Sequence, residues 1–457
     1  MLYDFLGVNK YAPDSLYEQV YENIRTAISS GALKKGDKLP SVRGLAQDIS
    51  VSRTTVETAY EQLCAEGYIE SRAKSGFFVV AEQLDPPMRK VQNTPAEEKV
   101  YVKKYRYDFS GAGADPECTD IKFWRRCVKE VLDRPSVITT YGAAQGEKEL
   151  RNALCDYSRR VRGVAAEPER IVVGAGTQTL LSVLLGLCGE YGFNAAMECG
   201  FFPQGEQIFR DFRYDITPLT ADKNGIILND DIKSRIIFVN SSGSIRGSAP
   251  IPINKRLQIV RYAKERDAVI VEDDYNGELR CTSKPVPALQ GLCPERVVYI
   301  GSFSRLLLPG VRISYMVLPP NLANMYARRC EYYNQTSSKT EQLALAQYIT
   351  CGRLERQLRK MRRHYAEKSA LLYSEAVKAF PNDTITEIIE TALCVRVKLK
   401  TDLPLDEIIS RANDNSISLG KCREKNGMKY IYMSFAEIPR SVIHEGVQLL
   451  ADICRKE

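Results

Sequence analysis

The chain has 457 residues, of which 44% are hydrophobic and 26% are charged, and its formal net charge is +7. This length exceeds one ordinary core and predicts two or three domains, while the balanced composition argues against a mainly disordered chain. The most apolar runs, such as LLSVLLGLC at 180–188, are far shorter than the ~20 residues of a membrane span, and the first residues lack a secretory signal pattern. We therefore expect a cytoplasmic protein with no membrane partner.

The sequence gives little support for a metal site or for a nucleophilic catalytic triad. The thirteen cysteines are scattered singly, and only two histidines, His364 and His444, are available to share a metal. Reduced thiols buried in the core fit this pattern better than a zinc site, and we predict no metal. The same scarcity of histidine argues against a Ser/His/Asp or Cys/His triad.

The N-terminal part of the chain predicts three helices followed by a β-hairpin. Apolar side chains recur every fourth position through LYEQVYENIRTAISS at 16–30, which is typical of a first helix. Ser41 and Ser52 can cap a second helix, SVRGLAQDI, and a third, RTTVETAYEQLCAEG. The tail YIESRAKSGFFVV predicts two short strands around a turn at Ser75-Gly76. Together these elements predict a winged helix-turn-helix, whose third helix enters the major groove of DNA.

The first turn of the third predicted helix carries side chains suited to DNA. Arg53, Thr54 and Thr55 would project there, where free N–H groups can also meet phosphates. Residues 1–82 nevertheless hold nine Lys and Arg against eleven Asp and Glu, so DNA binding must depend on local placement. The alternative is a winged helix used only for protein contacts, with the threonines as helix caps.

A family resemblance favours DNA. The segment LPSVRGLAQDISVSRTTVETAYEQLCAEGYIESRAKSGFFV resembles the DNA-binding domain of GntR-type bacterial regulators over its whole length. This resemblance implies duplex DNA with repeated half-sites as the partner of residues 1–82. The DNA-binding positions that we expect are Arg43, Ser52, Arg53, Thr54, Thr55 and Gly76, with Arg72 and Lys74 flanking the wing tip.

The rest of the chain predicts a connector and a large domain. Residues 83–105 contain three prolines and little periodicity, so they predict an extended linker. Residues 106–457 alternate apolar runs (RIIFVN, AVIVEDDY, VVYIGSF) with helical stretches, which predicts an α/β domain with a mainly parallel sheet. The last hundred residues or so predict a helix, strands around ALCVRVKLK and KYIYMSF, and a final helix. A smaller C-terminal α+β lobe is the expected result.

Three segments of this domain follow predicted strands and carry chemistry. GAGTQT at 174–179 leads into a helix N-terminus, which favours an anion. VEDDYNGELR at 271–280 carries carboxylates and a tyrosine, and GSFSRLLLPGVRIS at 301–314 carries serines and two arginines. With YGAAQGEKELR at 141–151, these motifs resemble a fold-type I aminotransferase domain. A GntR-type winged helix joined to such a domain is the architecture of the MocR subfamily of transcriptional regulators.

The resemblance implies a site for pyridoxal 5′-phosphate (PLP). It places Asp273 at the carboxylate that pairs with the protonated pyridine nitrogen, Tyr275 beside the ring oxygen O3′, and Phe201 against the ring face. The phosphate cup falls on Gly176, Thr177, Gln178, Ser302 and Arg312. The remaining expected cofactor-binding positions are Ser304 and Arg305.

Arg305 departs from the family at the residue that would react with PLP. The family pattern Ser-Phe-Ser-Lys reads Ser302-Phe303-Ser304-Arg305 here, and arginine stays protonated and is a poor nucleophile. The family's His-Gln and Pro-Thr-Gly segment reads VNSSGSIRGS at 239–248, and Tyr432 replaces an arginine that would hold a substrate carboxylate. We therefore expect no catalytic residue and no transaminase activity, with PLP bound non-covalently or absent.

The leading interpretation is a transcriptional regulator whose aminotransferase-like domain binds a small effector and forms a homodimer. One alternative is a PLP enzyme with a DNA-tethering domain, in which another lysine such as Lys339 takes over. A second alternative is a scaffold that binds no ligand and only holds two winged helices together. Arg305 disfavours the enzyme, while the residues do not separate the effector-binding regulator from the scaffold.

Overall fold

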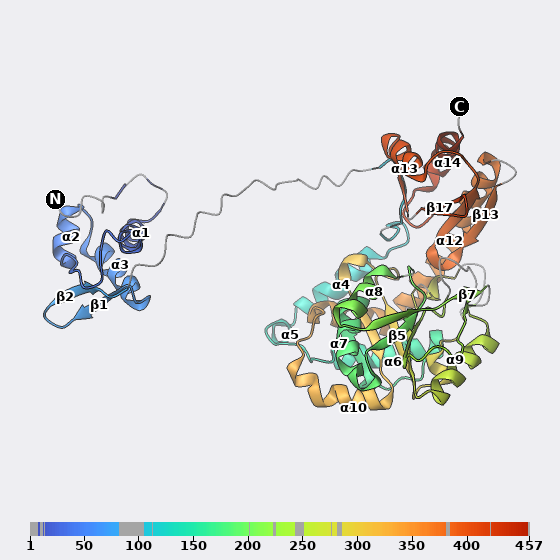
Figure 1. Cartoon of the computed structure of the whole chain (residues 1–457), viewed down its shortest axis with the longest axis horizontal. Coiled ribbons are helices and arrows are strands. Elements are labelled where there is room, and N and C mark those ends of the chain that lie inside the picture. The colour runs from blue at the N-terminus through green and yellow to red at the C-terminus, as the bar shows by residue number, and fades with distance from the viewer. Residues whose placement is uncertain are drawn as a thin grey trace. The chain divides into compact units, whose positions relative to one another are not determined.

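The computed structural model describes residues 8–9, 12, 14–81, 105–111, 113–200, 202–222, 225–242, 251–275, 277–280, 286–380, 384–420 and 422–455. The chain divides into two compact units, Met1–Val102 and Lys103–Glu457, and Figure 1 shows the elements of each. Each unit has its own buried apolar core. Among the helices described, none is long and apolar enough to cross a membrane.

The N-terminal unit is the predicted winged helix-turn-helix. It contains α1 (Leu16–Ser29), α2 (Val42–Asp48), α3 (Arg53–Ala65), β1 (Ile69–Arg72) and β2 (Gly76–Val79). Ser41 Oγ accepts a hydrogen bond from the N–H of Gly44, and Ser52 Oγ accepts one from the N–H of Thr55, so both predicted caps are confirmed. The hairpin turn comes slightly earlier than expected, because Gly76 already pairs with Arg72 in the antiparallel ladder.

The core of this unit lies between α1, α3 and the hairpin. Val20 and Ile24 of α1 are fully buried, as are Val56 and Tyr60 of α3. The ring of Tyr60 meets that of Phe77 edge to face at a centroid separation of 4.8 Å. Burial of these side chains fixes the hairpin against α3 and thereby sets where the wing stands relative to the helix that is expected to read DNA.

The large unit is built on a seven-stranded sheet of order β4-β12-β11-β10-β9-β5-β6. Its strands are β4 (Ile171–Gly174), β12 (Ser314–Val317), β11 (Val297–Ser302), β10 (Val269–Asp273), β9 (Ile236–Val239), β5 (Asn194–Met197) and β6 (Asp215–Pro218). Only β12 runs antiparallel to its neighbours in this sheet, so the predicted mainly parallel sheet is confirmed.

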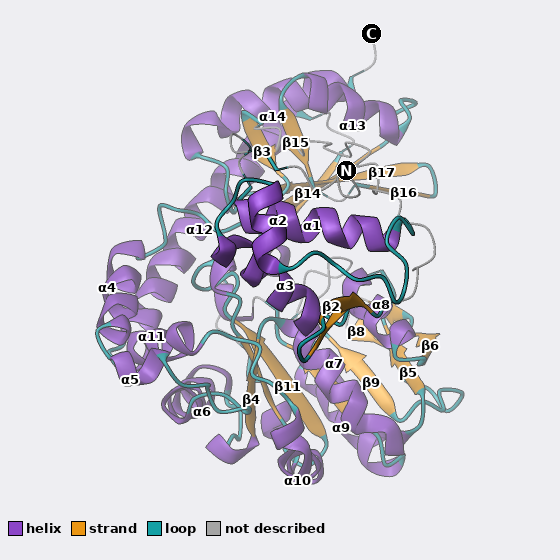
Figure 2. Cartoon of the chain, turned by 90° about the vertical axis from the view of Figure 1, so that its left-hand side faces the viewer, coloured by secondary structure: helices purple, strands orange, loops and turns teal. Residues whose placement is uncertain are grey.

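Helices cover both faces of the sheet (Figure 2). They are α4 (Ile121–Leu132), α5 (Pro135–Ile138), α6 (Lys148–Arg162), α7 (Thr177–Leu187), α8 (Pro203–Asp211), α9 (Ile253–Glu265), α10 (Pro320–Arg329) and α11 (Lys339–Thr350). Alternate strand residues enter different cores: Val172 joins the core beneath α7, whereas Ile171 and Val173 join the core that contains α6 and α11. Such two-sided burial is the reason why the strands read as continuous apolar runs.

The C-terminal part forms the expected smaller lobe. The long helix α12 (Arg353–Ala379) leads into a four-stranded sheet of β13 (Ile385–Ile389), β14 (Cys394–Leu399), β17 (Met428–Ser434) and β16 (Arg423–Lys425). The lobe also holds α13 (Leu405–Asp414), β15 (Ile417–Leu419) and α14 (Arg440–Cys454), and a further hairpin of the large unit is β7 (Ala221–Asp222) with β8 (Gly225–Ile226). β3 (Tyr107–Phe109) pairs in parallel with β15, so the first strand after the linker belongs to this lobe.

Candidate functional site

Three predicted segments converge at one edge of the large sheet. Ser302, the last residue of β11, pairs with Ser314 of β12, which in turn pairs with Gly174 at the end of β4. Asp273, the last residue of β10, pairs with Ile300, two positions before Ser302. The segments 174–179, 271–280 and 301–314 therefore meet where ligands bind in open α/β sheets, outside the carboxyl ends of the strands.

An anion cradle lies at the start of α7. Gly176 precedes the helix with φ +96°, and a Cβ added to it would lie 2.7 Å from Nη2 of Arg312, so this guanidinium stands directly against the loop. Thr177 and Gln178 open the helix, where backbone N–H groups have no partner within the helix. A guanidinium beside a helix N-terminus is suited to a phosphate group.

The serines of the next segment form a small hydroxyl cluster. Ser314 donates to Ser302 Oγ at 3.0 Å, and the Oγ atoms of Ser302 and Ser304 are 3.3 Å apart. Sequence reasoning missed Ser314, because it follows the loop that carries Arg312 and belongs to a four-residue strand that was not predicted. Ser314 can be recognised only from its pairing with Ser302 in the folded sheet, because no local sequence pattern shows this pairing.

Asp273 is a buried carboxyl without a protein partner among the described residues. Burial, together with the neighbouring carboxylates of Asp274 and Glu272, raises the pKa of Asp273 to about 7. Those neighbours are already bound: Arg162 forms two hydrogen bonds to Asp274, and the N–H groups of Leu289 and Gln290 donate to Glu272. Asp273 alone is therefore left to receive a cationic or N–H-bearing group of a ligand.

Arg305 connects the sheet edge to the segment that follows the linker. Its Nε donates to Tyr275 Oη at 3.0 Å, its Nη1 to the carbonyl of Gly113 at 2.9 Å, and its Nη2 to the carbonyl of Gly111 at 2.5 Å. The structure thus brings together the predicted residues Tyr275 and Arg305. Gly111 and Gly113 were missed, although the glycine-rich run SGAGAD beside the linker could have indicated a close backbone approach.

Glu437 is a second carboxyl close to this contact. A Cβ added to Gly113 would lie 2.2 Å from its Oε1, so only glycine fits there in the present arrangement. Burial raises the pKa of Glu437, the Asp108 carboxylate adds to this, and the Arg305 guanidinium opposes it. Tyr432, at the position where an arginine was expected, is buried on β17 opposite Arg396.

Two further expectations from the sequence concern the aromatic and altered segments and the alternative lysine. Phe201 and residues 243–248 of the segment VNSSGSIRGS lie outside the described residues. Lys339 stands at the start of α11, where its Nζ donates to Thr140 Oγ1 at 2.8 Å. Among the described contacts, its amine reaches neither Asp273 nor Tyr275.

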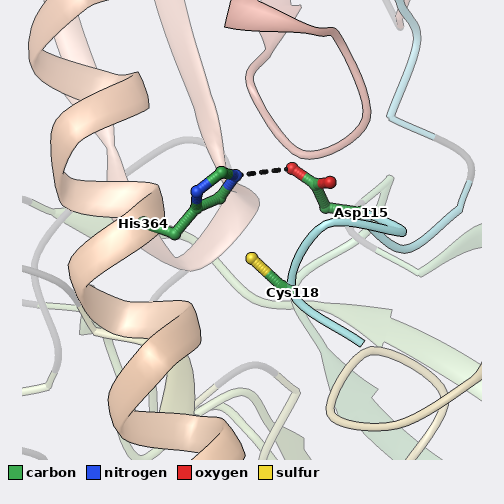
Figure 3. Close-up of side chains that lie close together, drawn as sticks. All are labelled: Asp115, Cys118 and His364. Atoms are coloured by element: carbon green, nitrogen blue, oxygen red, sulfur yellow. Dashed lines mark hydrogen bonds and ion pairs between the residues drawn. The ribbon is translucent and has the colours of Figure 1, made fainter. Parts of the chain in front are cut away.

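Asp115, Cys118 and His364 offer metal-ligating atoms that all lie within 4.8 Å of one another (Figure 3). The carboxylate of Asp115 accepts hydrogen bonds from His364 Nε2 at 2.8 Å and from Lys368 Nζ at 2.7 Å. Burial raises the pKa of Cys118 to about 12, which keeps the thiol protonated. With a lysine ammonium already on the carboxylate, this cluster is an ion-pair network that ties the segment after Gly113 to α12.

The predicted DNA-contacting residues divide into capping and exposed side chains. Ser52 and Thr55 bond to each other through their hydroxyls at 2.7 Å, so both take part in the cap of α3. Arg53 and Thr54, in the first turn of α3, and Arg43, on α2, have exposed side chains. Exposure of these three side chains is compatible with the predicted DNA contact, and Ser52 is exposed as well.

The wing carries a further basic group. Arg72 lies 2.6 Å from Glu70 and 4.5 Å above the ring of Phe78, and Lys74 is exposed at the tip. Sequence reasoning did not single out Lys38. Its backbone forms an isolated antiparallel bridge with Phe78 of β2, so the loop before α2 lies along the edge of the hairpin. The three lysines of ALKKGDKLP could have indicated this basic group, but the segment was interpreted only as a turn.

Comparisons with known proteins agree with both units. Residues 16–79 match the model of bacterial regulatory proteins of the gntR family, and residues 112–398 match that of aminotransferase class I and II. The uncharacterized HTH-type transcriptional regulator YdeL of Bacillus subtilis is 33% identical over 97% of this chain and 97% of its own length. The probable rhizopine catabolism regulatory protein MocR of Rhizobium meliloti is 32% identical over 79% of this chain and 77% of its own.

Solved structures resemble the large unit in fold. The kynurenine aminotransferase of Pyrococcus horikoshii superposes with a TM-score of 0.68 at 20% identity, covering 77% of this chain and 91% of its own. At this identity the likeness concerns the fold alone. It confirms the predicted fold-type I aminotransferase architecture.

Proposed function

Because the chain belongs to the gntR family of transcriptional regulators, in the MocR type that carries an aminotransferase class I and II domain, we propose that a PLP-shaped effector controls its binding to operator DNA. The winged helix supplies DNA binding, and the aminotransferase-like domain supplies the effector site and a homodimer interface. One observation carries this proposal. The edge of the large sheet has groups suited to PLP, but Arg305 stands where the resemblance expects the reactive lysine.

The residues present fit the cofactor at two ends. Gly176, the opening of α7 and Arg312 would hold the phosphate, because the backbone of Gly176 has a positive φ that favours glycine and the Arg312 guanidinium stands against this loop. Asp273 would receive the protonated ring nitrogen, a partner that its buried carboxyl lacks. When bound, PLP supplies an electron-withdrawing ring and an aldehyde carbon.

Arg305 cannot take over the work of a lysine at this edge. A guanidinium stays protonated in proteins, and three of its N–H groups are already engaged by Tyr275 and by the carbonyls of Gly111 and Gly113. It therefore neither attacks an aldehyde nor moves a proton to and from a substrate. What it does is fix the glycine-rich segment against the sheet, and this supports a binding site without transaminase activity.

The enzyme alternative requires another amine, and the two lysines considered are both engaged. Lys339 donates to Thr140. Lys368, which is buried, donates to Asp115 at 2.7 Å and to the carbonyl of Ala436 at 3.1 Å, and an ammonium held in this way is not a free nucleophile. These contacts favour the regulator over the enzyme.

Borohydride reduction tests the proposal. The full chain is incubated with PLP, treated with borohydride and digested, and the peptides are weighed by mass spectrometry. We expect reversible PLP binding that dialysis removes, and no phosphopyridoxyl group on any lysine of the pocket. A stoichiometric adduct on one lysine would contradict the proposal and revive the enzyme interpretation, and absence of any PLP binding would favour the scaffold.

The variant Arg305→Lys is the matched positive control. It restores a primary amine at the sheet edge while Asp273, Gly176 and Arg312 remain, so we expect a visible absorption band with PLP and a reducible adduct on the new lysine. If the variant binds PLP only as the parent chain does, the altered segment at 239–248 and Tyr432 have already changed the site.

A further inference from the structure

The net positive charge of this chain comes from residues outside its winged helix. The whole chain has 64 Lys and Arg against 57 Asp and Glu; residues 1–82 hold nine and eleven of these, so residues 83–457 hold 55 and 46. Phosphate neutralisation supplies most of the sequence-independent affinity of a protein for DNA. The winged helix has only nine basic side chains for this purpose, so basic side chains elsewhere in the chain can add to the affinity.

One face of α12 gathers exposed arginines. The first half of this helix reads RLERQLRKMRRH, and its buried side is formed by Leu354, Leu358, Met361 and Tyr365. Arg356, Arg359 and Arg363 follow one another at intervals of three and four residues and are exposed, so they form one row on the opposite side. We call these three residues the α12 basic row.

The α12 basic row is not neutralised within the large unit. In the described part of the chain, no hydrogen bond or ion pair engages the side chain of Arg356, Arg359 or Arg363. The nearest acid further along this face, Glu367, is already paired with Arg440. By contrast, Arg353 at the start of the helix lies 3.8 Å from Asp120, and Lys360 donates to the carbonyl of Glu117. Arg363 also interacts electrostatically with Glu367, but among the described residues none of the three arginines of the row forms a direct ion pair.

We propose that the α12 basic row binds the phosphate backbone of duplex DNA, as a contact separate from the winged helix. Arg356 and Arg363 lie seven positions apart, which is about 10 Å along the helix. The duplex axis advances by the same length over about three base pairs at about 3.4 Å each, so the row is long enough to lie beside several phosphates. Guanidinium groups suit phosphates because they can donate two parallel hydrogen bonds. The row adds affinity without sequence preference, which leaves selection of the operator to α3 and the wing.

The salt dependence of binding tests this inference. The full chain and the variant R356Q/R359Q/R363Q are titrated against a fluorescently labelled duplex of arbitrary sequence at several salt concentrations. Each lost phosphate contact should reduce the slope of log K against log salt by about 0.9, so the slope should fall by about 2.7. Across a fourfold rise in salt, the unaltered chain should then lose about 40-fold more affinity than the variant.

The matched control removes the same charge from other elements. The variant K233Q/R261Q/K425Q also replaces three exposed bases, none of which lies on α12. We expect this control to keep the slope of the unaltered chain, and both variants to keep its thermal unfolding. If the α12 variant keeps the full slope, or if both variants lose it equally, the row does not contact DNA and the proposal is wrong.

Discussion

Asp273 is a buried carboxyl for which the described residues provide no partner, and this is the reason why we propose it as a ligand-binding residue. Three consecutive acids end β10 and begin the following loop, and two of them are satisfied by the protein. Burial acts to raise the pKa of Asp274, but Arg162, Ser242 and Tyr299 together lower it. Asp273, by contrast, has burial and two like charges acting on it in the same direction. Such a carboxyl lowers the stability of the folded protein, so its presence indicates a role in function. Binding the cationic group of a ligand is one such role.

The variant Asp273→Asn should be more stable and bind PLP more weakly. Its carboxyl has a folded-state pKa raised from 3.8 to about 7. Below the lower value both folded and unfolded chains hold the proton, so Asp273 costs nothing there. The cost grows as the pH rises between the two values and is complete above about 7, where it reaches about 4 kcal/mol.

Thermal unfolding of the full chain and the variant, measured from pH 5 to 8, checks this sign. The gain in stability of Asp273→Asn should grow with pH and level off above about 7, while its affinity for PLP falls at least tenfold. The exposed Asp231→Asn should show neither change. Lower stability of Asp273→Asn at pH 8 would mean that the ionised carboxyl is held by the fold rather than kept for a ligand.

At the scale of the element, we expect α3 to read the DNA sequence. Its N-terminal turn is fixed by the Ser52 cap, so the exposed Arg53 is presented from a rigid start of the helix. We expect Arg53→Ala to weaken binding to operator DNA by about 1–3 kcal/mol, because a direct contact of arginine with a base contributes that much. A binding titration at fixed salt measures it.

The control for this prediction lies on α1. Arg25 is half-buried, whereas Arg53 is exposed, and it is paired with Glu22 at 2.9 Å, so Arg25→Ala should leave DNA affinity unchanged. Unaltered affinity and sequence preference of Arg53→Ala would remove Arg53 from the reading surface. Since Arg53→Ala acts on sequence preference and the α12 variant on the salt slope, the two proposals can fail independently.

Local signals explain which elements the sequence could predict. Helix caps, the apolar stripe of α1 and the continuous apolar runs of β9, β10 and β11 depend on neighbours within a few residues, and the structure confirms them. The short antiparallel strand β12 was missed because its role depends on pairing with β4, far earlier in the chain. Arg305 reaches Gly113 and Gly111 across 192 and 194 residues, and no local pattern reports such a contact.

At the scale of the whole molecule, the large unit has an apolar surface that is suited to a second copy. Leu132, at the end of α4, and Ile138, on α5, are each 48% exposed, and Tyr141 is fully exposed three residues later. These three exposed side chains lie within ten residues of the chain, and exposed apolar patches are common at protein interfaces. A two-fold pairing of this chain would cover both patches at once and place two winged helices for repeated half-sites.

We therefore expect a homodimer whose mass by light scattering is twice that of the 51.5 kDa chain. The double variant Ile138→Asp/Tyr141→Asp should shift the chain toward monomer, because each apolar side chain buried in the interface contributes about 1.5–3 kcal/mol and a buried carboxylate costs more. Ile385→Asp is the control, since Ile385 is also 48% exposed but lies on β13 of the small lobe. A clean monomer for the unaltered chain at micromolar concentration would contradict the prediction, and so would a dimer that survives the double variant but not the control.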